Sequence, residues 1–423
     1  MEARPSSNVD ARVEALTSAA RAAARALAAA PARARGTALG EAAARLRRTE
    51  AALLEANHGD VERARAAGES AAFVDRLTLT PARIEAMARG LEEIAALPDP
   101  VGETIAAWRR PNGLEIAQVR VPIGVVLTIY ESRPNVTADS AALCLKTANA
   151  VLLKGGSEAQ AANAAIADTL RGAVEAAGLP PAAVQLVDGG REVVRGLLGR
   201  DDRIDVVIAR GGEQLKRTIL EASRIPVIKH FDGICHLYVD ASADLAMAER
   251  ICLNAKVQRP SVCNAIENLL VHERVAPRFL PGMVSALRAH GCEVRGDPAT
   301  RAIVPDVVPA SDADWDTEYL DLILSVAVVP SLDAALAFIA RHSTALAEAI
   351  VTEDLTAARR FLGEVDSAAV FVNASTRFTD GYEFGFGAEV GISTNRLHAR
   401  GPMGLRELTT YKYRVIGSGQ VRS

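Results

Sequence analysis

The stretch "VPIGVVLTIYESRPNVTADSAALCLKTANAVLLKGG" (121–156) contains the pattern that decides the fold. An apolar run over 121–130 is followed by a helical pattern over 136–149 and a second apolar run over 150–155. Short apolar runs that alternate with helices are typical of parallel strands buried on both faces. The alternation continues to about residue 240. The sequence therefore predicts an α/β protein with a parallel sheet, whose ligands bind at the carboxyl ends of the strands.

The segments on either side of this region have different patterns. Residues 9–97 are rich in Ala, Arg and Glu, with apolar positions three and four apart, which predicts helices. The turn residues Pro111, Asn112 and Gly113 predict a hairpin or extended arm over 109–126. A second α/β region is expected over 237–391. The tail "LRELTTYKYRVIG" (405–417) is β-rich, and it pairs either with the arm or with another subunit.

Composition excludes several classes of protein. The 423 residues have a formal net charge of −4, which argues against a nucleic-acid or anionic-membrane partner. No apolar run reaches the ~18–20 residues that a membrane span needs. The five cysteines form no CxxC pair and the histidines no HExxH, which predicts free thiols, a reducing cytoplasm and no metal site.

Two strand ends are candidate cofactor contacts. "LLKGGSEA" (152–159) places Lys154 at a strand end and Ser157 at a helix start. "IARGGEQLK" (208–216) places Gly211 and Gly212 between a strand and a helix. Glycine pairs allow close backbone approach, and helix N-termini favour phosphate. Each signal is weak alone, because Gly-Gly turns are often only structural and no GxGxxG follows the first strand.

The segment "VQRPSVCNA" (257–265) contains the candidate nucleophile. Pro260 ends a helical pattern and a strand begins near Ala265, so Cys263 is expected in a short connector. A thiol of pKa ~8.5 becomes a useful nucleophile where amides or cations favour the thiolate, and Arg259 and Lys256 are close in sequence. The alternative is an inert buried cysteine. That interpretation is kept for Cys144, Cys252 and Cys292.

Three segments carry a family resemblance: 121–159, "NAKVQRPSVCNAIENLLV" (254–271) and 364–413. Through them the chain resembles the aldehyde dehydrogenase superfamily, and within it the branch that reduces L-glutamyl 5-phosphate. The resemblance implies an α/β fold with a Rossmann-type cofactor domain, an α/β catalytic domain and a small β oligomerisation arm. The expected boundaries are 1–108 and 122–235 for the NADPH-binding domain, 236–395 for the catalytic domain, and 109–121 and 396–423 for the arm and C-terminal strand.

The resemblance also implies the reaction. The Cys263 thiolate attacks the acyl phosphate and forms a thioester, and hydride from NADPH then gives L-glutamate 5-semialdehyde, the second step of proline biosynthesis from glutamate. Candidate oxyanion donors are the Cys263 amide and Asn135, although Asn135 is equally well explained as a turn or cap residue. The stretch 224–239 lacks the glutamate with which hydrolytic relatives activate water, which favours the phosphate-linked reaction. Asp232 is the only nearby carboxylate.

Further contacts are implied in the same way. Ser157 stands where NAD-preferring relatives carry a glutamate, and with Lys154 it favours NADPH. Glu318 resembles the glutamate that orients the nicotinamide ribose, with a surface carboxylate as the alternative. The expected substrate-binding residues, each of which an ordinary loop role would also explain, are Arg133, Asn373, Ser375, Thr376 and Arg377. Phe338 and Leu346 stand where this branch usually has histidines.

The resemblance implies two protein partners and leaves two other functions open. We expect a homo-oligomer, and glutamate 5-kinase is a possible partner for channelling. One alternative is another acylating aldehyde dehydrogenase that uses acyl-CoA or a different acyl donor. The other is a catalytically silent paralogue that serves as a binding subunit, although the intact "QRPSVCNA" argues against it.

Overall fold

The computed structural model describes residues 7–131, 133–229 and 232–422, which form two compact units. The first comprises Met1–Lys229, Gly385–Gly391 and Met403–Ser423, and the second comprises His230–Phe384 and Ile392–Pro402. The last strand of the first unit's parallel sheet, β7, covers Val227–Ile228.

A five-stranded parallel sheet, ordered β5-β4-β3-β6-β7, forms the centre of the first unit. Its other strands are β3 (Val125–Tyr130), β4 (Ala150–Gly155), β5 (Val184–Leu186) and β6 (Val206–Arg210). Every residue of β3 is buried, as expected for a strand covered on both faces. The α/β class predicted from the sequence is confirmed.

Helices cover both faces of this sheet. α6 and α7 pack on one face with α2, α3 and α5 outside them, and α1, α8 and α9 pack on the other. This arrangement follows from right-handed crossovers, since the chain winds from β3 to β5 in one direction and from β6 to β7 in the other. The helices are α1 (Ser7–Ala29), α2 (Ala32–Arg48), α3 (Glu50–Ala66), α4 (Ala71–Leu77), α5 (Pro81–Ala96), α6 (Asn135–Lys146), α7 (Gln160–Ala176), α8 (Arg191–Leu198) and α9 (Glu213–Ala222).

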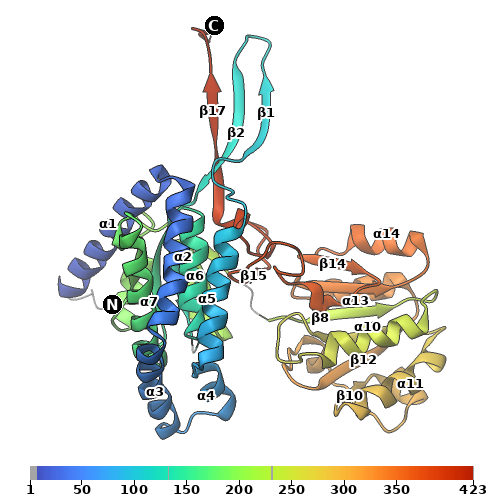
Figure 1. The fold of residues 1–423 in the computed structure, drawn as a ribbon. Coiled ribbons are helices and arrows are strands. Elements are labelled where there is room, and N and C mark those ends of the chain that lie inside the picture. The colour runs from blue at the N-terminus through green and yellow to red at the C-terminus, as the bar shows by residue number, and fades with distance from the viewer. Residues whose placement is uncertain (1–6, 132, 230–231, 423) are drawn as a thin grey trace. The chain divides into compact units, whose positions relative to one another are not determined.

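A three-stranded antiparallel ribbon extends from the first unit (Figure 1). β1 (Thr104–Arg109) and β2 (Glu115–Pro122) form the predicted hairpin, whose turn contains Gly113 at φ 88°. β17 (Thr409–Ile416) pairs with β2 along its whole length. Of the two partners open for the tail, the structure shows the arm of the same chain. The ribbon begins at 104, earlier than the expected 109, because β1 supplies its outer strand.

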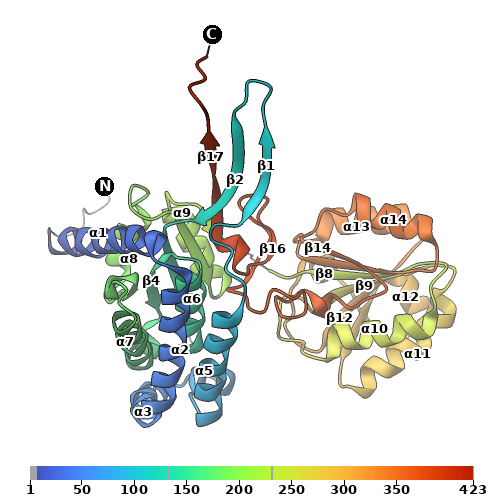
Figure 2. The ribbon, with the colours of Figure 1, turned by 45° about the horizontal axis from the view of Figure 1, so that its top comes forward.

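The second unit has a seven-stranded parallel sheet, ordered β11-β10-β12-β9-β8-β13-β14. α10 (Leu245–Val257), α11 (Ala276–Ala289) and α12 (Pro298–Ile303) lie on one face, and α13 (Leu332–His342) and α14 (Leu355–Glu364) lie on the other (Figure 2). The strands are β8 (Cys235–Val239), β9 (Ile266–His272), β10 (Glu293–Gly296), β11 (Val308–Pro309), β12 (Ile323–Val329), β13 (Ala347–Val351) and β14 (Ala369–Val372). A separate apolar core fills each face.

The structure differs from the expected domain plan near the C-terminus. Residues 385–391 belong to the first unit, although they were expected in the catalytic domain, and 396–402 belong to the second. The short strands β15 (Ile392–Ser393) and β16 (Gly401–Pro402) pair with each other. This exchange between units involves contacts between distant parts of the chain, which a local sequence pattern does not report.

Candidate active site

Cys263 lies in a turn between α10 and β9, in the connector expected from Pro260. Of the five cysteines, all of which the structure describes, Cys263 alone is half-buried and the other four are buried. Burial raises the pKa of each of those four thiols, so they stay protonated at neutral pH. Because reactive cysteines are partly exposed, Cys263 is the candidate nucleophile.

The position of Cys263 departs from the general rule for parallel sheets. Ligands were expected at the carboxyl ends of the strands, but Cys263 precedes β9 and therefore lies at the amino-terminal edge of the sheet in the second unit. In the first unit, by contrast, Lys154 and Gly211 follow β4 and β6 at the carboxyl-terminal edge. The candidate cofactor residues thus lie at the edge where ligands were expected, and the expectation, made for the sheet of residues 121–240, did not cover Cys263.

The backbone of Gly233 packs directly against the Cys263 loop. A Cβ atom at Gly233 would lie 1.9 Å from the Cys263 carbonyl oxygen, so only glycine fits. The Cys235 thiol donates to the same carbonyl oxygen at 3.3 Å. The Gly233 N–H donates to Glu318 Oε1 at 2.8 Å. Glu318, expected from sequence as a cofactor contact, thus binds the residue that packs against the nucleophile loop.

We expect Gly233→Ala to lower kcat by about 100-fold, since its methyl group has to displace the Cys263 backbone and an ångström of misplacement costs about that much. Steady-state kinetics and the rate of Cys263 alkylation measure the effect. Gly282→Ala is the matched control, because a Cβ at Gly282, in α11, meets nothing within 4 Å. Equal activity of the two variants would show that the loop tolerates the shift.

The expected substrate loop is clamped to the residue that follows Cys263. The Thr376 hydroxyl donates to the Asn264 carbonyl oxygen at 2.7 Å, and Asn264 Nδ2 donates to the Thr379 carbonyl at 2.9 Å. Arg377 donates through Nη1 to Asn264 Oδ1 and through Nε to Gln258 Oε1, the latter at 2.9 Å. The structure therefore brings Arg377 to the nucleophile loop.

Three other expected substrate residues have structural partners here. Thr376 is fully buried. The Ser375 hydroxyl accepts from the Arg377 N–H, and it caps the 3₁₀ turn Thr376–Phe378. The Asn373 side chain both accepts from Thr352 N–H and donates to Thr352 C=O, each at 2.9 Å. Arg133 is exposed in the loop between β3 and α6.

Sequence reasoning missed a buried ion pair beside the nucleophile loop. Lys256 Nζ lies 2.6 Å from Glu267 Oε2, and both side chains are fully buried. Burial raises the pKa of Glu267 to about 8, although Lys256 acts against the rise. Lys256 was expected to act on Cys263 as a nearby cation, but its contact is with Glu267. The eleven-residue separation gave no signal, because neither helix nor strand periodicity relates the two positions.

The remaining departures from the family pattern lie in the core. Phe338 stacks edge-on against His236 and Trp315, with ring centroids 5.9 and 5.4 Å apart. Leu346 is fully buried. His236 Nδ1 forms a hydrogen bond with Glu348 Oε2 at 2.9 Å. The His236 side chain lies on the opposite face of the sheet from Cys235, as alternation along β8 requires. These positions act in packing.

The candidate cofactor residues follow β4. Lys154 is half-buried and donates to the Gly155 carbonyl at 2.7 Å, and Ser157 is exposed. Burial lowers the pKa of Lys154, whereas Glu158 and Asp188 act in the opposite direction. A cation and a hydroxyl donor fit a ribose 2′-phosphate. Sequence reasoning missed Glu158, whose negative charge acts on Lys154.

Gly211 and Gly212 form the turn between β6 and α9, as expected. The Gly212 N–H donates to Glu131 Oε2 at 2.8 Å, and a Cβ at Gly211 would lie 2.4 Å from the same oxygen. The Glu131 carboxylate thus occupies the place at the α9 N-terminus that an anion would take. A phosphate that binds there has to displace Glu131.

Asn135 begins α6 in the first unit. Its amide donates to Asp139 Oδ2, one turn later, at 3.0 Å. Burial raises the pKa of Asp139 to about 6, although the Asn135 amide and Arg210 act against the rise. Asp139 therefore orients the amide of the candidate oxyanion donor, and no sequence motif pointed to it.

We expect Asp139→Asn to stabilise the protein above pH 6 and to have little effect below pH 4. A raised folded-state pKa means that wild type loses stability as pH rises from 3.8 to about 6, and the uncharged variant avoids that loss. The two-unit difference at 1.36 kcal/mol per unit gives up to about 3 kcal/mol. Urea unfolding of both proteins at pH 4 and pH 8 tests this. A gain that is equal at both pH values would assign the effect to packing.

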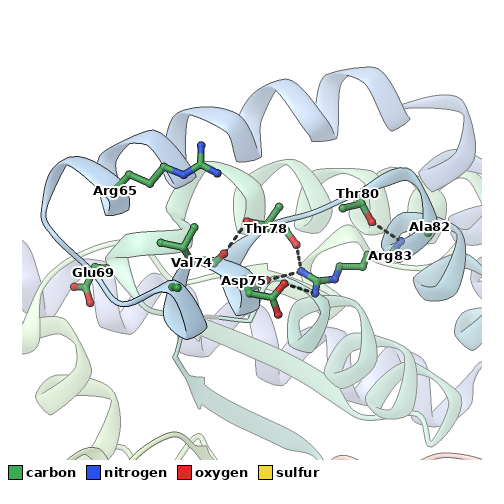
Figure 3. Close-up of a pocket in the computed structure, with 9 residues that line it drawn as sticks. Arg65, Glu69, Val74, Asp75, Thr78, Thr80, Ala82 and Arg83 are labelled. Carbon is green, nitrogen blue, oxygen red and sulfur yellow. Dashed lines mark hydrogen bonds and ion pairs between the residues drawn. The ribbon is translucent and has the colours of Figure 1, made fainter.

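Other hollows and clusters offer no rival site. A hollow of about 840 Å³ lies beside α3, α4 and α5. Among the residues that line it, Arg83 donates to Asp75 and to the Thr78 carbonyl (Figure 3). None of the candidate residues lines it. Within the described ranges, no group of three His, Cys, Asp or Glu side chains could hold a metal ion. No described helix is long and apolar enough to cross a membrane.

Known proteins resemble this chain in sequence and in fold. Residues 3–302 match the aldehyde dehydrogenase family model. The chain is 56% identical over 381 residues to gamma-glutamyl phosphate reductase of Moorella thermoacetica, covering 90% of this chain and 91% of the relative. The crystal structure of gamma-glutamyl phosphate reductase from Thermotoga maritima superposes with a TM-score of 0.96 at 48% identity, covering 97% of this chain and 100% of that one. An acetylating aldehyde dehydrogenase from Geobacillus thermoglucosidasius, 16% identical with a TM-score of 0.67 over 98% of each chain, shares the fold. The chain therefore belongs to the aldehyde dehydrogenase family, and within it to the gamma-glutamyl phosphate reductases.

Proposed function

We propose that this oxidoreductase reduces L-glutamyl 5-phosphate to L-glutamate 5-semialdehyde and phosphate, with NADPH as reductant, in the second step of proline biosynthesis. The observation that carries the proposal is the half-buried Cys263 in a chain whose other cysteines are buried and protonated. The names of its relatives supply the substrate.

The residues of the chain have separate tasks in this reaction. The Cys263 thiolate attacks the acyl carbon, and its carbon–sulfur bond forms as phosphate leaves. Gly233 leaves room for the Cys263 carbonyl. Asn135, whose amide is oriented by Asp139, is the side-chain donor for the oxyanion. NADPH, when bound, supplies the hydride that takes the thioester to the aldehyde level. Lys154 and Ser157 would hold its 2′-phosphate, and Glu318 its nicotinamide ribose.

The experiment runs the reaction backwards, with glutamate 5-semialdehyde, NADP⁺ and phosphate, and follows NADPH formation. Activity that requires phosphate supports the proposal. Activity without phosphate indicates a hydrolytic dehydrogenase, with Asp232 as a candidate base. Activity with coenzyme A in place of phosphate indicates an acyl-CoA enzyme. Bound cofactor without any turnover indicates a silent paralogue.

We expect Ser157→Glu to raise the KM for NADPH by about tenfold or more and to leave that for NADH nearly unchanged. A carboxylate at this position repels the 2′-phosphate and competes for Lys154. Initial rates with each cofactor measure the change, with Ser157→Ala as the control for loss of the hydroxyl alone. An equal rise for both cofactors would place Ser157 away from the 2′-phosphate.

We also infer a homo-oligomer built through the ribbon. In the described part of the chain, β1 and β17 pair with β2 alone, so each leaves an edge for a further strand. Trp108, Tyr411 and Tyr413 are exposed on it. Light scattering of Tyr413→Asp against wild type tests this.

We also propose a cytoplasmic location, with which the free cysteines agree. Glutamate 5-kinase is proposed as a partner for channelling, and copurification of the two proteins tests this.

A further inference from the structure

Two guanidinium groups belong to the loop around Cys263. Arg377 is anchored by hydrogen bonds to Gln258 and Asn264, the residues that bracket 259–263. Arg259 lies inside that segment and is exposed. The anchors of Arg377 are the oxygens of neutral amides, so they hold the guanidinium group in place without adding a negative charge.

The charges act on one another and on the nucleophile. Burial lowers the pKa of Arg377, and the neighbouring Arg259 guanidinium lowers it further, whereas Cys263 and Asp380 act in the opposite direction. Asp380 is itself engaged by backbone amides, accepting from Tyr382 N–H at 2.8 Å. Asp380 is thus a carboxylate that acts on Arg377 while it also accepts from backbone amides.

Two like charges on one loop repel each other, and an anion bound beside them lowers that repulsion. Guanidinium groups match phosphate oxygens in charge and in geometry, often through paired N–H donors. When the thiolate attacks an acyl phosphate, negative charge develops first on the carbonyl oxygen and then, as the intermediate collapses, on the leaving phosphate, which is bonded to the same carbon as the sulfur. Arg259 belongs to the loop that carries Cys263 and Arg377 is bonded to that loop, so both are candidates to bind the leaving group of a Cys263 reaction.

We propose that Arg377 and Arg259 bind the phosphoryl group of the acyl phosphate, so that Arg377 serves the leaving group and not the substrate α-carboxylate. This inference rests on the proposed function. The bond between sulfur and the acyl carbon forms first. The bond between the acyl carbon and the bridging oxygen of the phosphate then breaks, and its electron pair remains on the phosphate. The two guanidinium groups hold that charge until the phosphate takes a proton from water and departs.

The first test needs no turnover. Inorganic phosphate is expected to protect Cys263 of wild type against iodoacetamide, as followed by mass spectrometry of its peptide, while free glutamate does not protect. Arg259→Gln and Arg377→Lys each need about 10–100-fold more phosphate for the same protection, the range that charged hydrogen bonds provide. Arg278→Gln, an exposed arginine of α11, is the matched control and behaves as wild type. Protection by glutamate and not by phosphate would overturn the assignment.

The second test separates the two anions of the substrate. In the reverse reaction, Arg377→Lys and Arg259→Gln are expected to raise the KM for phosphate about 10–100-fold and to leave that for glutamate 5-semialdehyde nearly unchanged. A rise in the KM for the semialdehyde alone would assign Arg377 to the substrate α-carboxylate and would contradict the inference. Because Arg259 is exposed, a loss shared by both variants excludes a merely structural effect. If the reverse reaction of wild type proceeds without phosphate, the proposed function fails. The protection of Cys263 by phosphate still tests the anion site independently of that result.

Discussion

Replacing Cys263 by alanine is expected to lower kcat by about 10⁴-fold or more, because removal of a covalent nucleophile leaves no other route to the thioester. The half-buried position of Cys263, between α10 and β9, is the reason that this thiol alone has access to a carbonyl carbon. Phosphate-dependent NADP⁺ reduction measures the loss. Circular dichroism and cofactor binding establish that the variant is folded.

The control for this experiment is Cys292→Ala. Cys292 is buried in the core on the same face of the sheet, and burial raises the pKa of its thiol to about 11. Its loss affects packing and leaves the chemistry in place. A Cys263 variant that keeps more than about a tenth of wild-type activity would contradict the covalent mechanism, since tenfold corresponds to only 1.36 kcal/mol of barrier.

Replacing Lys256 by methionine is expected to destabilise the second unit by about 3–5 kcal/mol, because Glu267 is left buried without its partner. The Leu320 backbone N–H also favours the Glu267 carboxylate, but it does not replace the positive charge of the ammonium. Urea unfolding followed by Trp315 fluorescence in a Trp108→Phe background reports on this unit, since the chain has two tryptophans.

The pH dependence and a double variant sharpen this prediction. Without Lys256, the pKa of Glu267 rises further above about 8, so the carboxyl binds a proton more tightly folded than unfolded. Both folded proteins hold this proton below about pH 8, so the stability difference between them widens only as the pH rises above 8, where wild type ionises Glu267 and the variant does not. Lys256→Met/Glu267→Leu removes both charges and is expected to recover most of the loss. A double variant no more stable than Lys256→Met would show that the cost is lost packing.

Local sequence patterns predicted much of the fold for an identifiable reason. The alternation of apolar runs and helices over 121–240, the Pro111–Gly113 turn and the connector at Pro260 each depend on residues close together in the chain. The contacts that build the site do not. Gly233 meets Cys263 and Glu318, and Arg377 meets Asn264, across tens to more than a hundred residues.

The sequence by itself determined the α/β class, the strand ends that carry Lys154 and Gly211, and Cys263 as the thiol in the connector that follows Pro260. Only the tertiary structure decided that Glu131 caps α9, that Lys256 pairs with Glu267, and that Arg377 lies against the nucleophile loop. The physical reason is that periodicity and turn chemistry act over a few residues. Burial, charge pairing and the exclusion of a Cβ depend on backbones that meet only after folding.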